Sequence, residues 1–242
     1  MLERQPEGRP KRQWYGVVCA LVLVVPVSGC GTSTVALPAA RKPPCAADGG
    51  ALVGRLDGDP YPDRVTTGDH GRETVVEWGT PGGGFGRPVG IHSLAGAHHG
   101  EVAAGVAADI TGDDQLDLAV VVSRRPEMDD PSPARIGEVR VDPLHRNGRS
   151  GHTIGLGVDE NEGLSVTDLN HDGRPDVAVW EYHGDGMFGV TPLLGAGSGL
   201  SGSGAVNRWR TGDAGIADPV RLPQARLTQF YRRCGADGDG RG

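Results

Sequence analysis

The segment at residues 168–176 has the sequence D-L-N-H-D-G-R-P-D, which places oxygen-bearing side chains at its first, third, fifth and ninth positions. Calcium binds carboxylate, amide and carbonyl oxygens, and a loop with this spacing can wrap around the ion. Gly173 stands at the sixth position, where such a loop turns sharply. The predicted calcium ligands are Asp168, Asn170, Asp172, Asp176 and the backbone carbonyl of Arg174.

The residues around this segment argue against an EF-hand. An EF-hand adds a glutamate at the twelfth loop position and a helix on each side, whereas residue 179 is a valine. The flanking stretches 163–167 and 176–182 are short and rich in β-branched and aromatic residues, which favours strands. We therefore expect a calcium loop that joins two strands.

A second segment, at residues 109–117, repeats this design and precedes an apolar run of strand length at 118–122. Thr111 is a weaker ligand than a carboxylate, and Asp114 stands where glycine is usual, so we expect weaker calcium binding here. The predicted ligands are Asp109, Thr111, Asp113, Asp117 and the backbone carbonyl of Gln115.

A third copy of the pattern, at residues 55–63, carries Asp57, Asp59 and Asp63 but has Arg55 at its first position. A cation at a ligand position opposes metal binding, and a guanidinium can pair with carboxylates in place of the metal. We therefore favour a metal-free loop in which Arg55 pairs with the aspartates. Residues 55–63, 109–117 and 168–176 are called the first, second and third aspartate loops below.

The last aspartates of these loops, Asp63, Asp117 and Asp176, are 54 and 59 residues apart. That spacing leaves room for about four strands in each unit, so the sequence predicts a repeat protein. The units resemble the FG-GAP/VCBS repeats of integrin-α-type β-propellers, in which a D-x-D/N-x-D-G-x-x-D loop joins the first two strands of each blade. The resemblance covers residues 50–210 and is strongest in the second and third loops.

The resemblance implies an all-β fold, a β-propeller-like repeat domain with strand-loop-strand calcium sites. The chain is too short for an integrin propeller, so we expect about three to four blades, in a closed or an incomplete ring. Glycine is 41 of the 242 residues, which suits short strands and tight turns. The candidate strands include 51–53, 64–67, 74–78, 101–108 and 137–141, with a degenerate fourth unit at 217–222 and 227–231.

Residues 1–29 are organised as an export signal. A basic start is followed by an apolar run at 17–27, which is shorter than the roughly 20 residues that span a bilayer. The motif V-S-G-C that ends at Cys30 resembles the lipobox of bacterial lipoproteins. That resemblance implies cleavage before Cys30 and attachment of a lipid such as palmitate, which would hold the protein on the extracytoplasmic face of the cell membrane. An ordinary secretory peptide is the alternative.

Residues 30–49 are rich in Thr, Ser, Ala and Pro and are predicted to form a flexible tether. The repeat domain is expected at 50–234 and a disordered tail at 235–242. The chain has a net charge of −7, which argues against nucleic acid as a partner.

The cysteines outside the signal and the lipid site are Cys45 and Cys234, at the two ends of the repeat region. Export would place them in a compartment that permits disulfides, so we expect them to pair. Two free thiols in flexible chain ends are the alternative.

Other motifs give little evidence for catalysis or for a cofactor besides Ca²⁺. The match to G-x-G-x-x-G at 197–202 lacks a βαβ frame, and the histidine pair at 98–99 lacks a third ligand at a metal-binding spacing. The sequence contains no G-x-S-x-G, H-E-x-x-H or C-x-x-C motif.

These observations together predict an exported, lipid-anchored, calcium-binding repeat protein that is not an enzyme. It would act as a binding or scaffolding module at the cell surface, with an envelope protein or a glycan as its ligand. A hydrolase-like envelope enzyme or enzyme subunit is the alternative, because propellers also host enzymes. A purely structural envelope protein is a third possibility.

Overall fold

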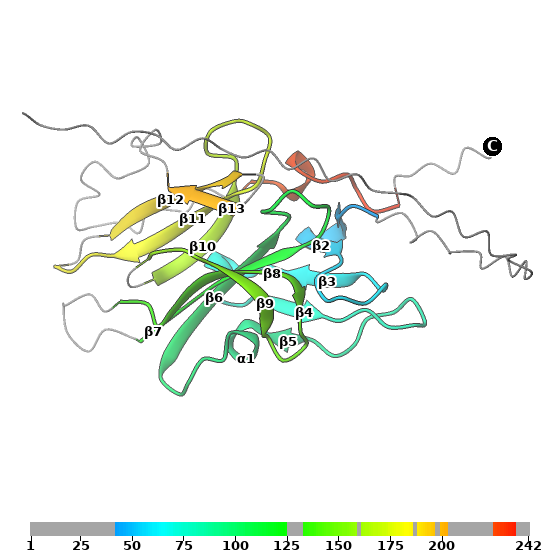
Figure 1. The fold of residues 1–242 in the computed structure, drawn as a ribbon, viewed down its shortest axis with the longest axis horizontal. Helices are drawn as coiled ribbons and strands as arrows, with labels where there is room; N and C mark the ends of the chain where they lie inside the picture. The colour runs from blue at the N-terminus through cyan, green and yellow to red at the C-terminus, as the bar shows by residue number, and fades with distance from the viewer. Residues whose placement is uncertain are drawn as a thin grey trace, which may run out of the picture. The chain divides into compact units, whose positions relative to one another are not determined.

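The computed structural model describes residues 42–124, 133–158, 161–185, 188–196, 199–202 and 225–235. The chain divides into two units, Met1–Ala39 and Ala40–Gly242, and all of the described residues belong to the second unit. Their fold is all-β, with three antiparallel sheets and a few short helices (Figure 1).

In the first sheet, each strand pairs with the next strand along the chain. Two short 3₁₀ helices, η1 (Asp48–Gly50) and η2 (Asp69–Gly71), connect strands of this sheet, and a short helix, α1 (Ile91–Ala95), follows its last strand. The strands are β1 (Cys45–Ala46), β2 (Ala51–Gly54), β3 (Asp63–Thr66), β4 (Val75–Glu77) and β5 (Val89–Gly90).

The second and third sheets are also antiparallel meanders in chain order, each of four strands. The second sheet contains β6 (Glu101–Ala108), β7 (Asp117–Arg124), β8 (Ile136–Leu144) and β9 (Ser150–Gly155). The third sheet contains β10 (Asn161–Thr167), β11 (Asp176–Tyr182), β12 (Phe188–Ala196) and β13 (Gly199–Gly202). Each aspartate loop joins two neighbouring strands, β2 to β3, β6 to β7 and β10 to β11.

Strand β7 shows how the second sheet is covered on both faces. Side chains alternate between the faces of a strand. Leu118, Val120 and Val122 belong to a core shared with the first sheet, and Ala119 and Val121 belong to a core shared with the third sheet. All five are fully buried, which explains the uninterrupted apolar run in the sequence.

The segment at residues 225–235, called the C-terminal segment below, connects the first and third sheets. The backbone N–H of Ala225 donates to the carbonyl of Val166 in β10 at 3.0 Å. At its other end, Cys234 forms a disulfide with Cys45, and the N–H of Cys234 donates to the carbonyl of Ala46 at 2.9 Å. The structure therefore joins the two cysteines that we expected to pair, across a sequence separation of 189 residues.

Some expected boundaries are wrong. The tether was expected to reach residue 49, but Cys45–Ala46 already pairs with β2 as strand β1. The stretch at 227–231 was expected to be a strand, but Leu227–Gln229 is the 3₁₀ helix η4. The N–H of Tyr231 bonds locally to the carbonyl of Leu227, so it cannot donate to a neighbouring strand.

The sheets alone do not establish a propeller ring. The stretch at 217–222, expected in a fourth unit, lies outside the described residues, as does Cys30. In the described part of the chain, no helix has the length and apolar character needed to cross a membrane.

Candidate functional site

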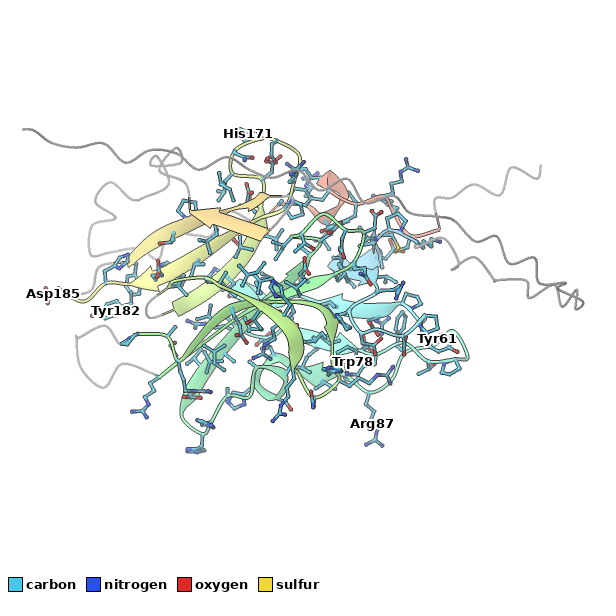
Figure 2. The ribbon with its side chains drawn as sticks, viewed as in Figure 1. Tyr61, Trp78, Arg87, His171, Tyr182 and Asp185 are labelled. Carbon is cyan, nitrogen blue, oxygen red and sulfur yellow. A yellow bond between two sulfur atoms is a disulfide. The ribbon has the colours of Figure 1, made fainter. Side chains whose placement is uncertain are left out.

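The three aspartate loops lie beside one another at one edge of the sheets. The N–H of Leu116 in the second loop donates to the carbonyl of Arg55 in the first loop at 2.8 Å. The second and third loops together line a cavity of about 290 Å³, which Phe230 and Tyr231 of the C-terminal segment also line. In the third sheet, His171 at the tip of its loop lies at the opposite end from Asp185, in the turn after β11 (Figure 2).

The ninth position of each loop is occupied by a fully buried aspartate: Asp63, Asp117 or Asp176. One carboxylate oxygen of each accepts the backbone N–H of the second residue of its own loop, at 2.7–2.9 Å. These aspartates therefore fix the start of each loop to the first residue of the following strand.

The other carboxylate oxygen distinguishes Asp117 from its counterparts. Asp63 accepts the N–H of Gly79, and Asp176 accepts the N–H of Gly195, each at 2.8 Å. Each donor belongs to the strand that follows the buried aspartate's own strand, or lies just after it: Gly195 is in β12, and Gly79 comes shortly after β4. The equivalent oxygen of Asp117, Oδ1, is buried without a hydrogen-bond partner within the described ranges.

In the second sheet, strand β8 is irregular near the corresponding place. Strand β8 pairs regularly with β7, but its pairing with β9 shifts between Val141 and Leu144, beside the position that would have to serve Asp117. Burial raises the pKa of Asp117 to about 7, and it also raises the pKa values of Asp63 and Asp176. Desolvation is the main cause in each case, because it penalises the charged form.

The second and third loops share a backbone conformation. Their fourth residues, Gly112 and His171, and their sixth residues, Asp114 and Gly173, all have a φ between 63° and 81°. Each loop thus has one glycine and one non-glycine residue in the left-handed region, in exchanged order. Aspartate tolerates this region better than most residues, which explains how Asp114 replaces the usual glycine.

This conformation directs backbone N–H groups at the first aspartate of each loop. Asp109 accepts the N–H groups of Gly112, Asp113 and Asp114 at 2.7–3.1 Å. In the third loop, Asp168 accepts those of Asp172 and Gly173 at 3.0 and 3.1 Å.

The remaining predicted ligands also bond within their own loops. Asp113 accepts the N–H and the side-chain amide of Gln115, each at 3.0 Å, and the Thr111 hydroxyl donates to Asp117 at 3.1 Å. Asp172 accepts the N–H of Arg174 at 2.9 Å and the side-chain amide of Asn170 at 3.1 Å. In the described part of the chain, no group of three or more His, Cys, Asp or Glu side chains is arranged to hold a metal ion.

The first loop differs because its sixth residue is Pro60, whose ring holds φ near −65° and excludes the left-handed conformation. Its carboxylates pair with Arg146, from the turn between β8 and β9. The Nε of Arg146 lies 2.9 Å from an Asp57 oxygen, and a terminal nitrogen lies 2.7 Å from Asp59. The guanidinium also lies over the ring of Trp78, 5.8 Å from its centre.

The expectation for Arg55 is therefore wrong in its detail. Its Nε donates to the backbone carbonyl of Asp59 at 3.1 Å, and the guanidinium paired with the carboxylates belongs to Arg146. Arg146 is 89 residues from Asp57, and no spacing pattern connects the two residues in sequence.

The sequence also gave no indication that the C-terminal segment contacts the aspartate loops. The N–H of Asp109 donates to the Tyr231 hydroxyl at 2.8 Å, and the side-chain amide of Gln229 lies 3.4 Å from Asp168. Burial raises the pKa of the Tyr231 hydroxyl. Comparisons with models of known protein families, with curated proteins and with solved structures found no match to this chain.

Proposed function

We propose that this protein is an exported, lipid-anchored calcium-binding module that binds or scaffolds a partner on the extracytoplasmic face of the cell membrane. The observation that carries the calcium proposal is the contrast between the loops. The first loop pairs its carboxylates with Arg146. The second and third loops share a different backbone, in which the carboxylates accept their own N–H groups.

The donors of the second and third loops suit a hard cation, because all of them are carboxylate, amide, hydroxyl or carbonyl oxygens. Calcium would be held by Asp109, Thr111, Asp113, Asp117 and the Gln115 carbonyl, and by Asp168, Asn170, Asp172, Asp176 and the Arg174 carbonyl. An ion there would supply positive charge to carboxylates that burial disfavours as anions. The loop N–H groups orient these carboxylates before the ion arrives, and binding would exchange some of those hydrogen bonds for metal contacts.

The arrangement of the sheets supports an FG-GAP/VCBS-type organisation for this module. Three meanders follow one another along the chain, and each carries an aspartate loop ahead of a strand that begins with a buried aspartate. The second sheet packs its two faces against its neighbours, as a blade of a propeller would. We include a small or incomplete propeller in the proposal.

A binding role is favoured over catalysis because the ionisable side chains of the loops already have structural partners. A carboxylate held by calcium is a poor general base, since the ion lowers its pKa and occupies its lone pairs. An envelope protein or a glycan is the proposed ligand class at the cell surface. Turnover of an ester, glycoside or phosphate substrate, abolished by one substitution outside the loops, would favour the enzyme alternative.

Calcium titration of the thermal unfolding temperature tests the proposal on the exported chain carrying Cys30→Ser. Calcium should raise Tm, because an ion that binds only the folded state stabilises it by mass action. The rise should begin at calcium concentrations of roughly 10⁻⁴ to 10⁻³ M and continue with the logarithm of the concentration above them. Asp172→Ala should remove more of the rise than Asp59→Ala, since Asp59 is paired with Arg146. An unchanged Tm in calcium would refute calcium binding.

A further inference from the structure

A cavity of about 480 Å³ lies where β2, β6 and β10, the strands that precede the three aspartate loops, meet the C-terminal segment. Its apolar wall includes Leu52 of β2, Val106 of β6 and Val166 of β10, and Leu227 contributes from the C-terminal segment. Each of the three sheets thus supplies part of the wall. Small-molecule sites in proteins have volumes of roughly 300 to 1,000 Å³ and are mostly apolar with a few polar groups, so this cavity has a suitable size.

Two arginines of the C-terminal segment, Arg226 and Arg233, also line this cavity and are exposed to solvent. The acidic residue in the lining is Asp48. The cavity therefore carries more positive than negative charge, although the whole chain has a net charge of −7. Hydroxyl groups of Thr67 and Thr228 add hydrogen-bonding capacity to the same lining.

We propose that this cavity binds a small amphipathic anion, with its hydrocarbon part against the apolar wall and its anionic head at Arg226 and Arg233. This inference rests on the proposed role as a binding module and adds the chemical class of a ligand. Burying the hydrocarbon part against the apolar wall removes apolar surface from water, which favours binding. A guanidinium matches carboxylate and phosphate oxygens in paired hydrogen bonds, so either head group would satisfy the site.

The chain offers a matched control for the charge. Arg232 is exposed and belongs to the same segment, but it is not among the residues that line this cavity; it lines a neighbouring cavity with Asp109 and Asp114, and Arg233 lies between the two cavities and lines both. Replacing Arg232 changes the net charge of the segment as much as replacing Arg226 or Arg233 does. A difference between these variants therefore reports the position of the charge and not its amount.

Isothermal titration of the Cys30→Ser chain with decanoate, decyl phosphate and decanol, each below its aggregation concentration, tests the proposal. One or both anions should bind, and decanol should bind at least about tenfold more weakly, a factor that corresponds to one charge-assisted hydrogen bond. Tighter binding of one anion identifies the head group. The single variants Arg226→Gln and Arg233→Gln should each weaken binding of the anion, and the double variant should lose about tenfold. Arg232→Gln, which removes one charge as each single variant does, should bind as the parent does.

Thr228→Trp provides a second test, because it places a large side chain at an exposed position of the lining without altering the charge. It should abolish binding. The proposal is overturned if neither anion binds the parent chain, if Arg232→Gln loses as much affinity as the single variants Arg226→Gln and Arg233→Gln, or if Thr228→Trp binds normally. The calcium-dependent rise of Tm, measured on the same samples, separates a failure of this cavity from a failure of the calcium proposal.

Discussion

Arg146 places a positive charge beside the carboxylates of the first aspartate loop. Its guanidinium pairs with Asp57 and Asp59. Pro60 prevents the first loop from adopting the backbone conformation of the second and third loops. The arginine comes from the second sheet, whereas the loop belongs to the first. The interaction therefore also ties two sheets together.

Arg146→Ala is expected to lower the free energy of unfolding by about 1 kcal/mol. Asp57 is buried and would lose its partner, but Arg146 is half exposed, so solvent screens much of the pair. Urea denaturation in EDTA would measure the change. Arg149→Ala, an exposed arginine in the same turn, is the control and should have almost no effect. Equal losses in the two variants would show that the pairing with Asp57 and Asp59 is not stabilising.

Asp117 gives the second prediction, which concerns pH. Its pKa is raised from 3.8 to about 7 in the folded state, so between these values the folded protein binds more protons than the unfolded chain. Without calcium, the free energy of unfolding should therefore fall as the pH rises from 4 to 7, by up to about 4 kcal/mol from this group. Asp63 and Asp176 should add to the effect in the same direction.

Chemical denaturation in EDTA across this pH range would measure the slope, and Asp117→Asn should make it shallower. Calcium should also flatten the slope, because a bound cation favours the charged carboxylate. Asp48→Asn, at an exposed aspartate outside the loops, should leave the slope unchanged. A stability that rises with pH over this interval would contradict the raised pKa.

The placement of each aspartate loop between two strands could be predicted from spacing along the chain, because each loop is a run of nine consecutive residues beside strand-forming stretches. The left-handed residue at Gly173 follows from glycine itself. The partners of Asp63 and Asp176 could not be predicted in the same way. Gly79 and Gly195 are 16 and 19 residues away, and they become donors only through the pairing of the strands.

A strand could be predicted from sequence where its burial produces an apolar run or an alternation of apolar residues. Strands that are exposed or very short have no such pattern and could not be predicted. The run Leu118–Val122 is apolar because both of its faces are covered, so its strand was evident from sequence. Strand β9, Ser150–Gly155, is mostly exposed and carries no apolar alternation. Strand β1 has only two residues, and its pairing with β2 leaves no periodic signal.

The C-terminal segment gives the third prediction, because it joins the first and third sheets through the disulfide of Cys45 and Cys234. A covalent link across 189 residues removes conformational entropy from the unfolded chain, which corresponds to about 5 kcal/mol in the entropic model. The double variant Cys45→Ala and Cys234→Ala should lose stability by up to this amount. Reductant should destabilise the parent chain and leave the variant unaffected. Equal sensitivity of both to reductant would show that the bond does not stabilise the fold.

The stacking of three sheets brings residues far apart in the sequence to one edge of the molecule. The second and third loops and the C-terminal segment line one cavity, and the same segment lines the larger cavity between the strands. The Tyr231 hydroxyl and the Gln229 amide contact the second and third loops directly. These contacts connect the second and third loops with the segment that carries Arg226 and Arg233.

The last prediction concerns where the whole protein is held. The motif V-S-G-C that ends at Cys30 follows an apolar run of signal-peptide length, and the first described strand begins at residue 45, so a short connection would separate a lipid on Cys30 from the sheets. Two or more acyl chains hold a protein stably at a bilayer, whereas a chain without lipid has no such anchor.

Cys30→Ser should therefore move the protein from the membrane fraction to the soluble fraction or block its maturation, and metabolic labelling with palmitate should mark the parent chain but not Cys30→Ser. Cys19→Ser changes a cysteine inside the expected signal and serves as the control, because it should leave both the labelling and the fractionation unchanged. A Cys30→Ser protein that stays as firmly in the membrane fraction as the parent, and still incorporates palmitate, would place the anchor elsewhere in the chain.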